Sequence, residues 1–387
     1  MTGSLQEKNG RYQMVINTKD ANGKRKVKWI STGLPIKGNK RKAEQMLNAL
    51  LVEYTDMGYV EPLKVRFGDF VLDWVEMNCS KLEATTYMNY IHLLKKHVCP
   101  YFQATGLQLQ DITPDIIQRY YNAKANEGLS PNTIIKHHAV IRSALQYAVR
   151  TKLLKENPCD FVDKPKRRKY VGEFYNAAEI KKLFEAAKGS PIEMPIFLAS
   201  YFGLSRSECL GLRWDAIDFF RGMLTVRRKV VRAVVDGKLV NIDSGKLKTE
   251  ARYRVLPLDD QLMEFLREAR NRQEWHRQIC GDSYGKDYLD HVCVNGMGEL
   301  LNPDYVTDAF SKLLKSNGLK QIRFHDLRHS CASLLLALGY SMKDIQEWLG
   351  HSNFQTTANI YSHVDPRNKK EMIRGLSSAL GNLNEPN

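Results

Sequence analysis

The alternation of hydrophobic and polar residues changes its period along the chain and marks out successive structural regions. Near the N-terminus, residues 11–16 and 26–30 alternate in the manner of β-strands, and Asn22-Gly23 favours a tight hairpin turn between them. Residues 40–54 then carry apolar side chains at helical spacing. This pattern predicts a small sheet backed by one helix.

Between residues 67 and 157 the pattern is helical throughout. Apolar stripes start near Phe67, Tyr87 and Ile112, and Ser130-Pro131 is a typical start for a further helix. Four or five amphipathic helices in about 90 residues are typical of an α-helical bundle.

The remaining residues, from 171 onward, show a mixed pattern. Helices are predicted at 178–187, 194–201 and 305–314 and from Asp326 onward, and a β-rich stretch with a turn at Asp236-Gly237 at 223–258. Ser341 is predicted to cap a helix over residues 342–349, with Asp344 in its first turn and Gly350 at its end. The third part is therefore expected to be mainly α-helical with a small antiparallel sheet.

The amino-acid composition indicates what kind of partner the protein binds. The 387 residues have a formal net charge of +15, which favours a polyanionic partner, nucleic acid ahead of a membrane surface. No apolar run of about 18 residues and no apolar signal core occur, so a membrane-spanning or secreted protein is not expected. The seven cysteines are scattered without a CxxC pair, which indicates reduced thiols in a cytoplasm.

Basic residues gather at positions suited to binding the phosphates of DNA. Residues 8–42 contain eleven Lys or Arg and one Asp, and residues 164–169 hold five basic residues around Pro165. The predicted DNA contacts are Arg11, Lys24, Arg25, Lys26 and Lys28 in the first sheet, Lys136 in the bundle, and Lys166, Arg167 and Arg168 in the linker. His137 and His138 are expected to share the polar helix face of Lys136. A solvated charged face and a solvated linker are the alternatives.

The densest group of reactive residues is His325, Arg328 and His329, followed by His351 and Tyr361. This set suits phosphoryl transfer without a metal, because a guanidinium fork and imidazole donors bind non-bridging oxygens. A tyrosine hydroxyl can act as the nucleophile. Taken singly, each histidine would be a core residue and Tyr361 a core aromatic, but their combination and order favour a site.

These motifs resemble those of the tyrosine recombinases, the phage integrase family, in the three-domain form of integrases from temperate phages and integrative conjugative elements. The H-x-x-R box is His325 and Arg328, the L-G-H box ends at His351, and the nucleophile box surrounds Tyr361. The β-hairpin lysine of the family matches Lys248, although a surface lysine is the alternative there, since Lys246 would share its strand face.

The resemblance implies a multidomain fold and an enzyme. Residues 1–64 would form an α+β arm-binding domain with a three-stranded sheet plus a helix, residues 65–165 an all-α core-binding bundle, and residues 166–387 a mainly α catalytic domain with a small antiparallel sheet and a C-terminal tail. The implied activity is site-specific DNA integration or excision through a 3′-phosphotyrosyl link, with Tyr361 as nucleophile and Lys248 as acid. Arg328, His325 and His351 would hold the phosphate, and neither metal, ATP nor cofactor is required.

The same resemblance implies partners and a location. The partners would be double-stranded DNA at core and arm attachment sites, three further copies in a homotetramer, and accessory excision and DNA-bending proteins, with no membrane. The protein would be cytoplasmic in a bacterial host and associated with the nucleoid. The tail around residues 369–380 has helical spacing, and packing on a neighbour and on its own domain both stay open.

One position departs from the family pattern. The first arginine box usually reads G-L-R-x-x-E, and counting back from Glu208 places Ser205 in the arginine position, with Arg206 one residue later. A shift of one residue turns a helical side chain by about 100°. Arg206 is therefore a candidate phosphate ligand that replaces the missing arginine. A catalytically impaired integrase-like DNA-binding protein is the alternative.

Two other enzyme classes share part of this pattern. His325-x-x-x-His329 has the spacing of a zinc-binding helix, but Asp326 replaces the usual Glu and Arg328 would place positive charge beside the metal. A type IB topoisomerase uses similar chemistry, but a separate basic hairpin domain favours a two-site recombinase.

Overall fold

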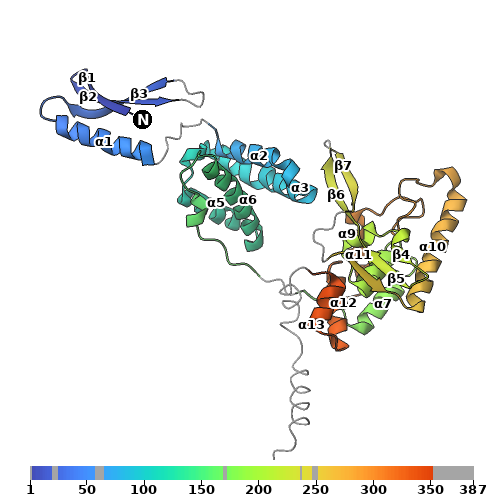
Figure 1. The fold of residues 1–387 in the computed structure, drawn as a ribbon. Helices are drawn as coiled ribbons and strands as arrows, with labels where there is room; N and C mark the ends of the chain where they lie inside the picture. Colours follow the sequence, from blue (N-terminus) through green and yellow to red (C-terminus); the bar gives the residue numbers. More distant parts are fainter. Residues whose placement is uncertain are drawn as a thin grey trace, which may run out of the picture. The chain divides into compact units, whose positions relative to one another are not determined.

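The computed structural model describes residues 2–19, 25–56, 65–168, 172–235, 238–245 and 252–351 (Figure 1). The chain forms two compact units, residues 1–169 and 170–387. The three-domain division at residues 64 and 165 stays a prediction. No helix within the described ranges is long and apolar enough to cross a membrane.

The N-terminal sheet has three antiparallel strands in the order β1 (Thr2–Lys8), β2 (Arg11–Lys19) and β3 (Arg25–Pro35). Asn9 and Gly10 connect β1 to β2 with φ angles of 52° and 73°, the left-handed conformation that a two-residue hairpin turn requires. The predicted turn at Asn22-Gly23 lies outside the described residues. Helix α1 (Lys40–Asp56) packs on β1, where a Cβ on Gly3 would be 3.0 Å from Leu51. The predicted three-stranded sheet plus helix is confirmed.

The helical body of the first unit confirms the predicted bundle. Its helices are α2 (Phe67–Met77), α3 (Ala84–Leu93), the π-helical turn η2 (Leu94–Val98), α4 (Cys99–Thr105), α5 (Pro114–Asn126) and α6 (Pro131–Arg150), with single turns η1 (Cys79–Lys81), η3 (Leu109–Asp111) and η4 (Pro158–Phe161). Thr113 and Ser130 cap α5 and α6 by accepting backbone N–H groups, and proline follows each cap. Aromatic and aliphatic side chains of these helices form one buried core.

The expectation for His137 and His138 was wrong. Both are buried in α6, and their Nδ1 atoms lie 2.8 Å and 2.9 Å from the hydroxyls of Tyr120 and Tyr121 on α5. Burial lowers the pKa of His137 to about 4, so its ring is neutral at pH 7. These polar residues lie in the core because each has a hydrogen-bond partner there, whereas Lys136 beside them is exposed.

The second unit contains helices around a small antiparallel sheet, as predicted. The helices are α7 (Ala177–Ala187), α8 (Glu193–Phe202), α9 (Arg206–Gly211), α10 (Asp260–Cys280), α11 (Pro303–Ser316), α12 (Asp326–Ala337) and α13 (Met342–Leu349), with single turns η5 (Trp214–Ala216) and η7 (Gly281–Ser283). One sheet has the order β4 (Ile217–Asp218), β5 (Met223–Val226) and β8 (Arg254–Pro257), and β6 (Lys229–Val235) pairs with β7 (Lys238–Ser244) in a hairpin (Figure 1).

Helix α8 is central to this unit, since α7, α9 and α12 all pack against it. Two glycines permit close approaches between neighbouring elements. A Cβ on Gly211 would be 2.7 Å from the Cα of Lys229, so glycine is needed where α9 meets β6. Gly203 has φ +60°, and a Cβ there would be 2.2 Å from Leu349 Cδ2. The ends of α8 and α13 are therefore held close together.

Candidate functional site

Arg328 lies at the centre of the cluster that the sequence predicted. It is in the first turn of α12 and is buried. Its Nη1 donates to the carbonyl of Gly203 at 2.7 Å, and its Nη2 donates to the carbonyl of Leu349. Its Nε lies 3.2 Å from His351 Nε2. The structure thus brings Arg328 and His351 together where α8, α12 and α13 meet.

The surroundings of this cluster favour the neutral form of its histidines. His351 accepts the Arg328 hydrogen bond through Nε2, so that nitrogen carries no proton. Burial, followed by the positive charge of Arg328, lowers the pKa of His351 to about 3. Partial desolvation, followed by His329 and Arg328, lowers the pKa of His325 to about 4, although this residue reaches the surface. Neutral imidazoles here can donate hydrogen bonds to an anion without adding charge.

Glu208 on α9 is the buried carboxylate beside this cluster. Its Oε2 accepts the backbone N–H of Ser205 at 2.8 Å and lies 3.5 Å from Arg254 Nη2 and from Arg328 Nη1. Burial alone would raise its pKa, but Arg254 and Arg328 hold the pKa of Glu208 below its ordinary value. Arg252 Nη1 approaches the other oxygen, Oε1, at 3.9 Å. One carboxylate thus faces three guanidinium groups, which leaves two positive charges in excess.

Sequence reasoning did not identify Glu208, Arg252 and Arg254 as parts of the site. Glu208 was used only to locate the arginine position of the family motif. Arg254 and Glu208 are 46 residues apart, so their contact depends on tertiary packing. A charged residue directly before the apolar stretch Val255-Leu256-Pro257-Leu258 was the available signal, because a buried charge requires a partner.

Arg206 is not part of this cluster. Its Nη1 donates to the carbonyl of Pro303 at 2.8 Å and to Thr307 Oγ1, and lies 4.0 Å from Asp304 Oδ1. All three partners belong to α11. The one-residue shift from Ser205 has therefore turned this arginine toward another helix, where it ties α9 to α11.

The two histidines whose spacing suggested zinc binding contact each other. The rings of His325 and His329 are 5.2 Å apart. Asp326 is fully buried and accepts from Arg323 Nη2 at 2.7 Å and from Arg323 Nε at 3.0 Å, so its carboxylate holds the start of α12. Among the described residues no group of three His, Cys, Asp or Glu side chains is arranged to hold a metal ion.

Two predicted catalytic residues, Lys248 and Tyr361, lie outside the described residues, as does Lys24. The side chains of Arg25 and Lys26 are likewise outside the described part. The other predicted DNA contacts are exposed: Arg11, Lys28, Lys136, Lys166, Arg167 and Arg168.

The basic linker is hydrogen-bonded to the helical bundle near both of its ends. Asn132 on α6 donates to the Arg168 carbonyl at 2.9 Å and accepts the Arg168 N–H at 3.1 Å. At residue 163, the backbone N–H donates to Gln118 Oε1 at 3.0 Å. The linker therefore follows the surface of the bundle as far as Arg168.

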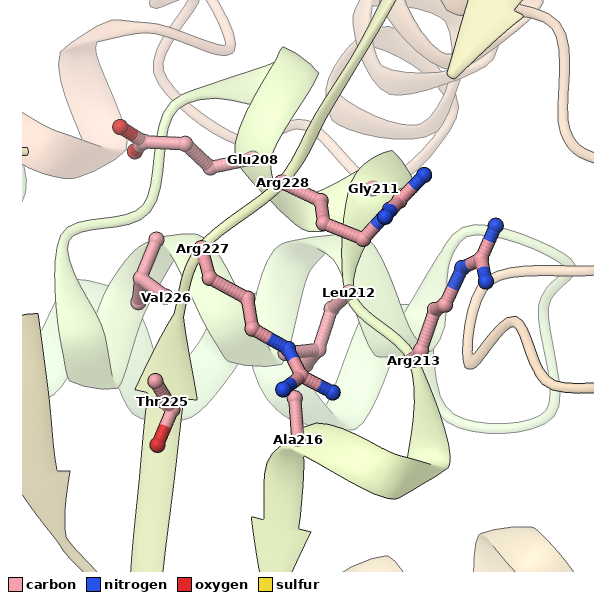
Figure 2. A pocket seen from close by; sticks show the side chains of 9 residues that line it. All are labelled: Glu208, Gly211, Leu212, Arg213, Ala216, Thr225, Val226, Arg227 and Arg228. Atoms are coloured by element: carbon pink, nitrogen blue, oxygen red, sulfur yellow. The ribbon is translucent and has the colours of Figure 1, made fainter. Parts of the chain in front are cut away.

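A second polar network lies at the base of the β6–β7 hairpin. Asp243 accepts from Arg228 Nε at 3.0 Å and from Arg213 Nη2, and His291 Nε2 lies 3.3 Å from it. Arg213 and Arg228 line a small pocket together with Gly211, Leu212, Ala216, Thr225, Val226, Arg227 and Glu208 (Figure 2). The Glu208 carboxylate points away from these two arginines in Figure 2, so the two networks are separate.

Comparisons with known proteins agree with this fold. The sequence profile of the phage integrase family matches residues 173–368, and that of the phage integrase N-terminal SAM-like domain matches residues 66–125. A "Tyrosine recombinase XerC-like" protein of Caldanaerobacter subterraneus subsp. tengcongensis is 29% identical over 389 residues, covering 96% of this chain and 97% of the relative.

Two solved structures share the fold at low sequence identity. The integrase of the Tn1549 transposon, in complex with a circular intermediate DNA, superposes with a TM-score of 0.65 at 16% identity, over 81% of this chain and 99% of that one. A lambda integrase tetramer bound to a Holliday junction gives 0.55 at 19% identity, over 92% and 94%. From the family profile and the full-length relative, the chain belongs to the phage integrase family and is a tyrosine recombinase, an enzyme of DNA recombination.

Proposed function

We propose that this recombinase integrates or excises a mobile element by cutting and rejoining DNA through a 3′-phosphotyrosyl intermediate. The observation that carries the proposal is the contact of Arg328 with His351 beside His325, in a cluster with excess positive charge. Such a cluster is suited to an anion whose charge grows during reaction, as it does on the non-bridging oxygens of a phosphate under attack.

The roles follow from the chemistry of each side chain. Arg328 would turn part of its guanidinium fork from backbone carbonyls to the phosphate, and His325 and His351 would donate to the same oxygens. Tyr361 would attack phosphorus as the Tyr–O bond forms and the bond to the 5′-oxygen breaks, and Lys248 would protonate that leaving oxygen. The phosphotyrosyl link conserves the energy of the phosphodiester, so the reaction needs neither ATP nor a metal. Attack by the partner strand's 5′-hydroxyl releases Tyr361.

Arg206 is the least suited of the predicted phosphate ligands. To reach an anion beside Arg328 it would have to release Pro303 and Thr307 on α11. Removing one preorganised donor from a transition state costs about 10²–10³ in rate. This cost motivates the second candidate function, an impaired integrase that mainly binds DNA, because Ser205 supplies no guanidinium.

We propose that DNA binding uses the exposed basic residues of the first unit. Arg11 and Lys28 on the sheet, Lys136 on α6, and Lys166 to Arg168 are exposed cations, with Lys24, Arg25 and Lys26 completing the predicted set. The lambda integrase tetramer on a Holliday junction supports a homotetramer for this chain too. Accessory excision and DNA-bending proteins would complete the assembly.

Covalent trapping tests the proposed reaction. The protein is mixed with a nicked suicide duplex from the ends of its own element, and the adduct is measured on a denaturing gel with and without EDTA. We expect an EDTA-resistant adduct that disappears in Tyr361→Phe. A wild-type protein that forms no adduct, while Ser205→Arg does, would establish the impaired alternative. An adduct that persists in Tyr361→Phe would contradict the assignment of the nucleophile.

A further inference from the structure

Arg252 differs from the other two arginines around Glu208 in its exposure. Its side chain is 36% exposed, whereas those of Arg254 and Arg328 are each 5% exposed. It lies just before β8 (Arg254–Pro257), which packs beside α13, the helix that precedes His351. Of the three guanidinium groups, that of Arg252 is therefore the most accessible to a ligand arriving from solvent.

The hydrogen-bond donors of the three arginines are used differently. Arg328 donates to Gly203, Leu349 and His351. Arg254 donates from Nη1 to the Arg252 carbonyl at 3.1 Å and lies 3.5 Å from Glu208 through Nη2. The guanidinium of Arg252, by contrast, makes one ion pair among the described residues, at 3.9 Å, which exceeds hydrogen-bond distance. No described residue accepts a hydrogen bond from this guanidinium, which leaves its donors for an anion.

The backbone of Arg252 is nevertheless held in place. The hydrogen bond from Arg254 fixes its carbonyl, and Arg254 is itself buried against Glu208. A side chain that starts from a fixed backbone loses less freedom when it binds a ligand, which is the property required of a preorganised donor.

Position 205 adjoins the same carboxylate. The Ser205 N–H donates to Glu208 Oε2 at 2.8 Å, and Arg252 Nη1 approaches Oε1 at 3.9 Å. Residue 205 and the Arg252 guanidinium therefore flank one buried group, while Arg206 has turned to α11. We propose that Arg252 is a catalytic residue that replaces the arginine missing at Ser205, binding a non-bridging oxygen of the scissile phosphate. This inference rests on the proposed phosphotyrosyl reaction.

Single-turnover cleavage of the nicked duplex tests this role. We expect Arg252→Ala to lower the rate constant for adduct formation about 10²–10³-fold. Arg252→Lys should fall between Arg252→Ala and wild type, because it keeps the charge but loses the fork. The affinity for uncleaved duplex should change by less than about tenfold, the effect of losing one phosphate contact. The midpoint of thermal unfolding should stay within about 2 °C, which excludes misfolding as the cause.

Two further arginine variants sharpen the assignment. Arg277→Ala on α10 is the matched control, because that arginine is 52% exposed and forms a 3.7 Å ion pair with Glu274 of its own helix. It should cleave within about twofold of wild type, as expected for a surface pair. Arg206→Ala should lose less than about tenfold, since its role is to join α9 to α11. A loss of 10²–10³ in Arg206→Ala, with Arg252→Ala unaffected, would assign the phosphate contact to Arg206 instead.

Rescue separates phosphate binding from a merely structural role. Adding Ser205→Arg to Arg252→Ala should restore at least about tenfold in rate, because both positions flank Glu208. A methylphosphonate at the scissile position lacks one charged oxygen and should narrow the gap between Arg252→Ala and wild type. If wild type and Arg252→Ala form the adduct at the same rate, this inference is wrong and the proposed reaction still stands. A wild-type protein that never forms the adduct overturns the proposed reaction and this inference with it.

Discussion

Glu208 and Asp243 are two carboxylates in the same unit, and each faces arginines. The two networks differ in how closely the guanidinium groups approach the carboxylate. Asp243 accepts directly from Arg228 at 3.0 Å and from Arg213, so these donors are used on the carboxylate. Around Glu208 the guanidinium nitrogens lie at 3.5 to 3.9 Å. The Asp243 network is a closed clamp on the β6–β7 hairpin, whereas the Glu208 network is open and can exchange a partner for an anion.

The two networks also differ in the exposure of their side chains. The Glu208 side chain is 1% exposed and that of Asp243 is 13% exposed. Two of the arginines around Glu208 are almost fully buried, while Arg213 and Arg228 are 28% and 29% exposed. In both networks burial alone would raise the carboxyl pKa, and the arginines hold it below its ordinary value. Around Glu208 the charges of Arg254 and Arg328 are therefore largely shielded from water, while Arg252, which is 36% exposed, gives an anion access to them.

Glu208→Gln breaks the open network and should have the largest effect on stability. It keeps the shape of the side chain but leaves three guanidinium groups without a counter-charge. We expect a loss of about 3–5 kcal/mol in the free energy of unfolding, as for other buried ion pairs deprived of one partner. Denaturant titration of the full chain measures it. The control is Glu264→Gln, whose carboxylate is 63% exposed beside Arg267. A loss no larger than in the control would contradict the buried-charge account.

Local signals in the sequence predicted much of the fold. Ser341 caps α13 by accepting the Asp344 N–H at 3.2 Å, and Asp344 accepts the Ser341 N–H at 3.0 Å. Both residues were predicted in these positions because a cap depends on neighbours three residues apart. The spacing of apolar residues predicted the bundle in the same way, because apolar side chains at helical spacing lie on one face of a helix and that face is buried.

Contacts between distant residues limited prediction of the site. The motif residues Arg328 and His351 were expected to share one site, and they are in contact. The contact of Arg328 with Gly203 joins residues 125 positions apart, and no local sequence pattern indicates it. His137 was assigned to a surface because polar residues usually lie there, and its partner Tyr120 is on another helix. Arg206 kept the right residue type near the right position, yet a turn of one helical residue sent it to α11.

Acid titration tests how strongly the open network resists further positive charge. His351 has a folded pKa of about 3, below the ordinary value of 6.5. Below pH 6.5 the unfolded chain therefore binds a proton at this position before the folded chain does, and the free energy of unfolding falls as the pH falls. Allowing for its partial exposure, we expect wild type to lose about 2 kcal/mol more than His351→Gln between pH 7 and pH 4. Denaturant titrations at each pH measure the difference. Parallel stability curves for the two proteins would show that His351 is not held neutral by its surroundings.

Asp243→Asn opens the closed network and should have the smallest effect of the three. The amide keeps one acceptor, and Arg213 and Arg228 can turn to water, so we expect a loss of about 1 kcal/mol in the free energy of unfolding. Asp218→Asn is the matched control, because Asp218 pairs at 3.9 Å with an exposed Arg221. If the clamp only supports the hairpin, cleavage of the nicked duplex should fall less than about tenfold in Asp243→Asn. A larger loss would mean that the clamp also positions the segment carrying Lys248, which follows β7, and the two networks would then act on the same phosphate.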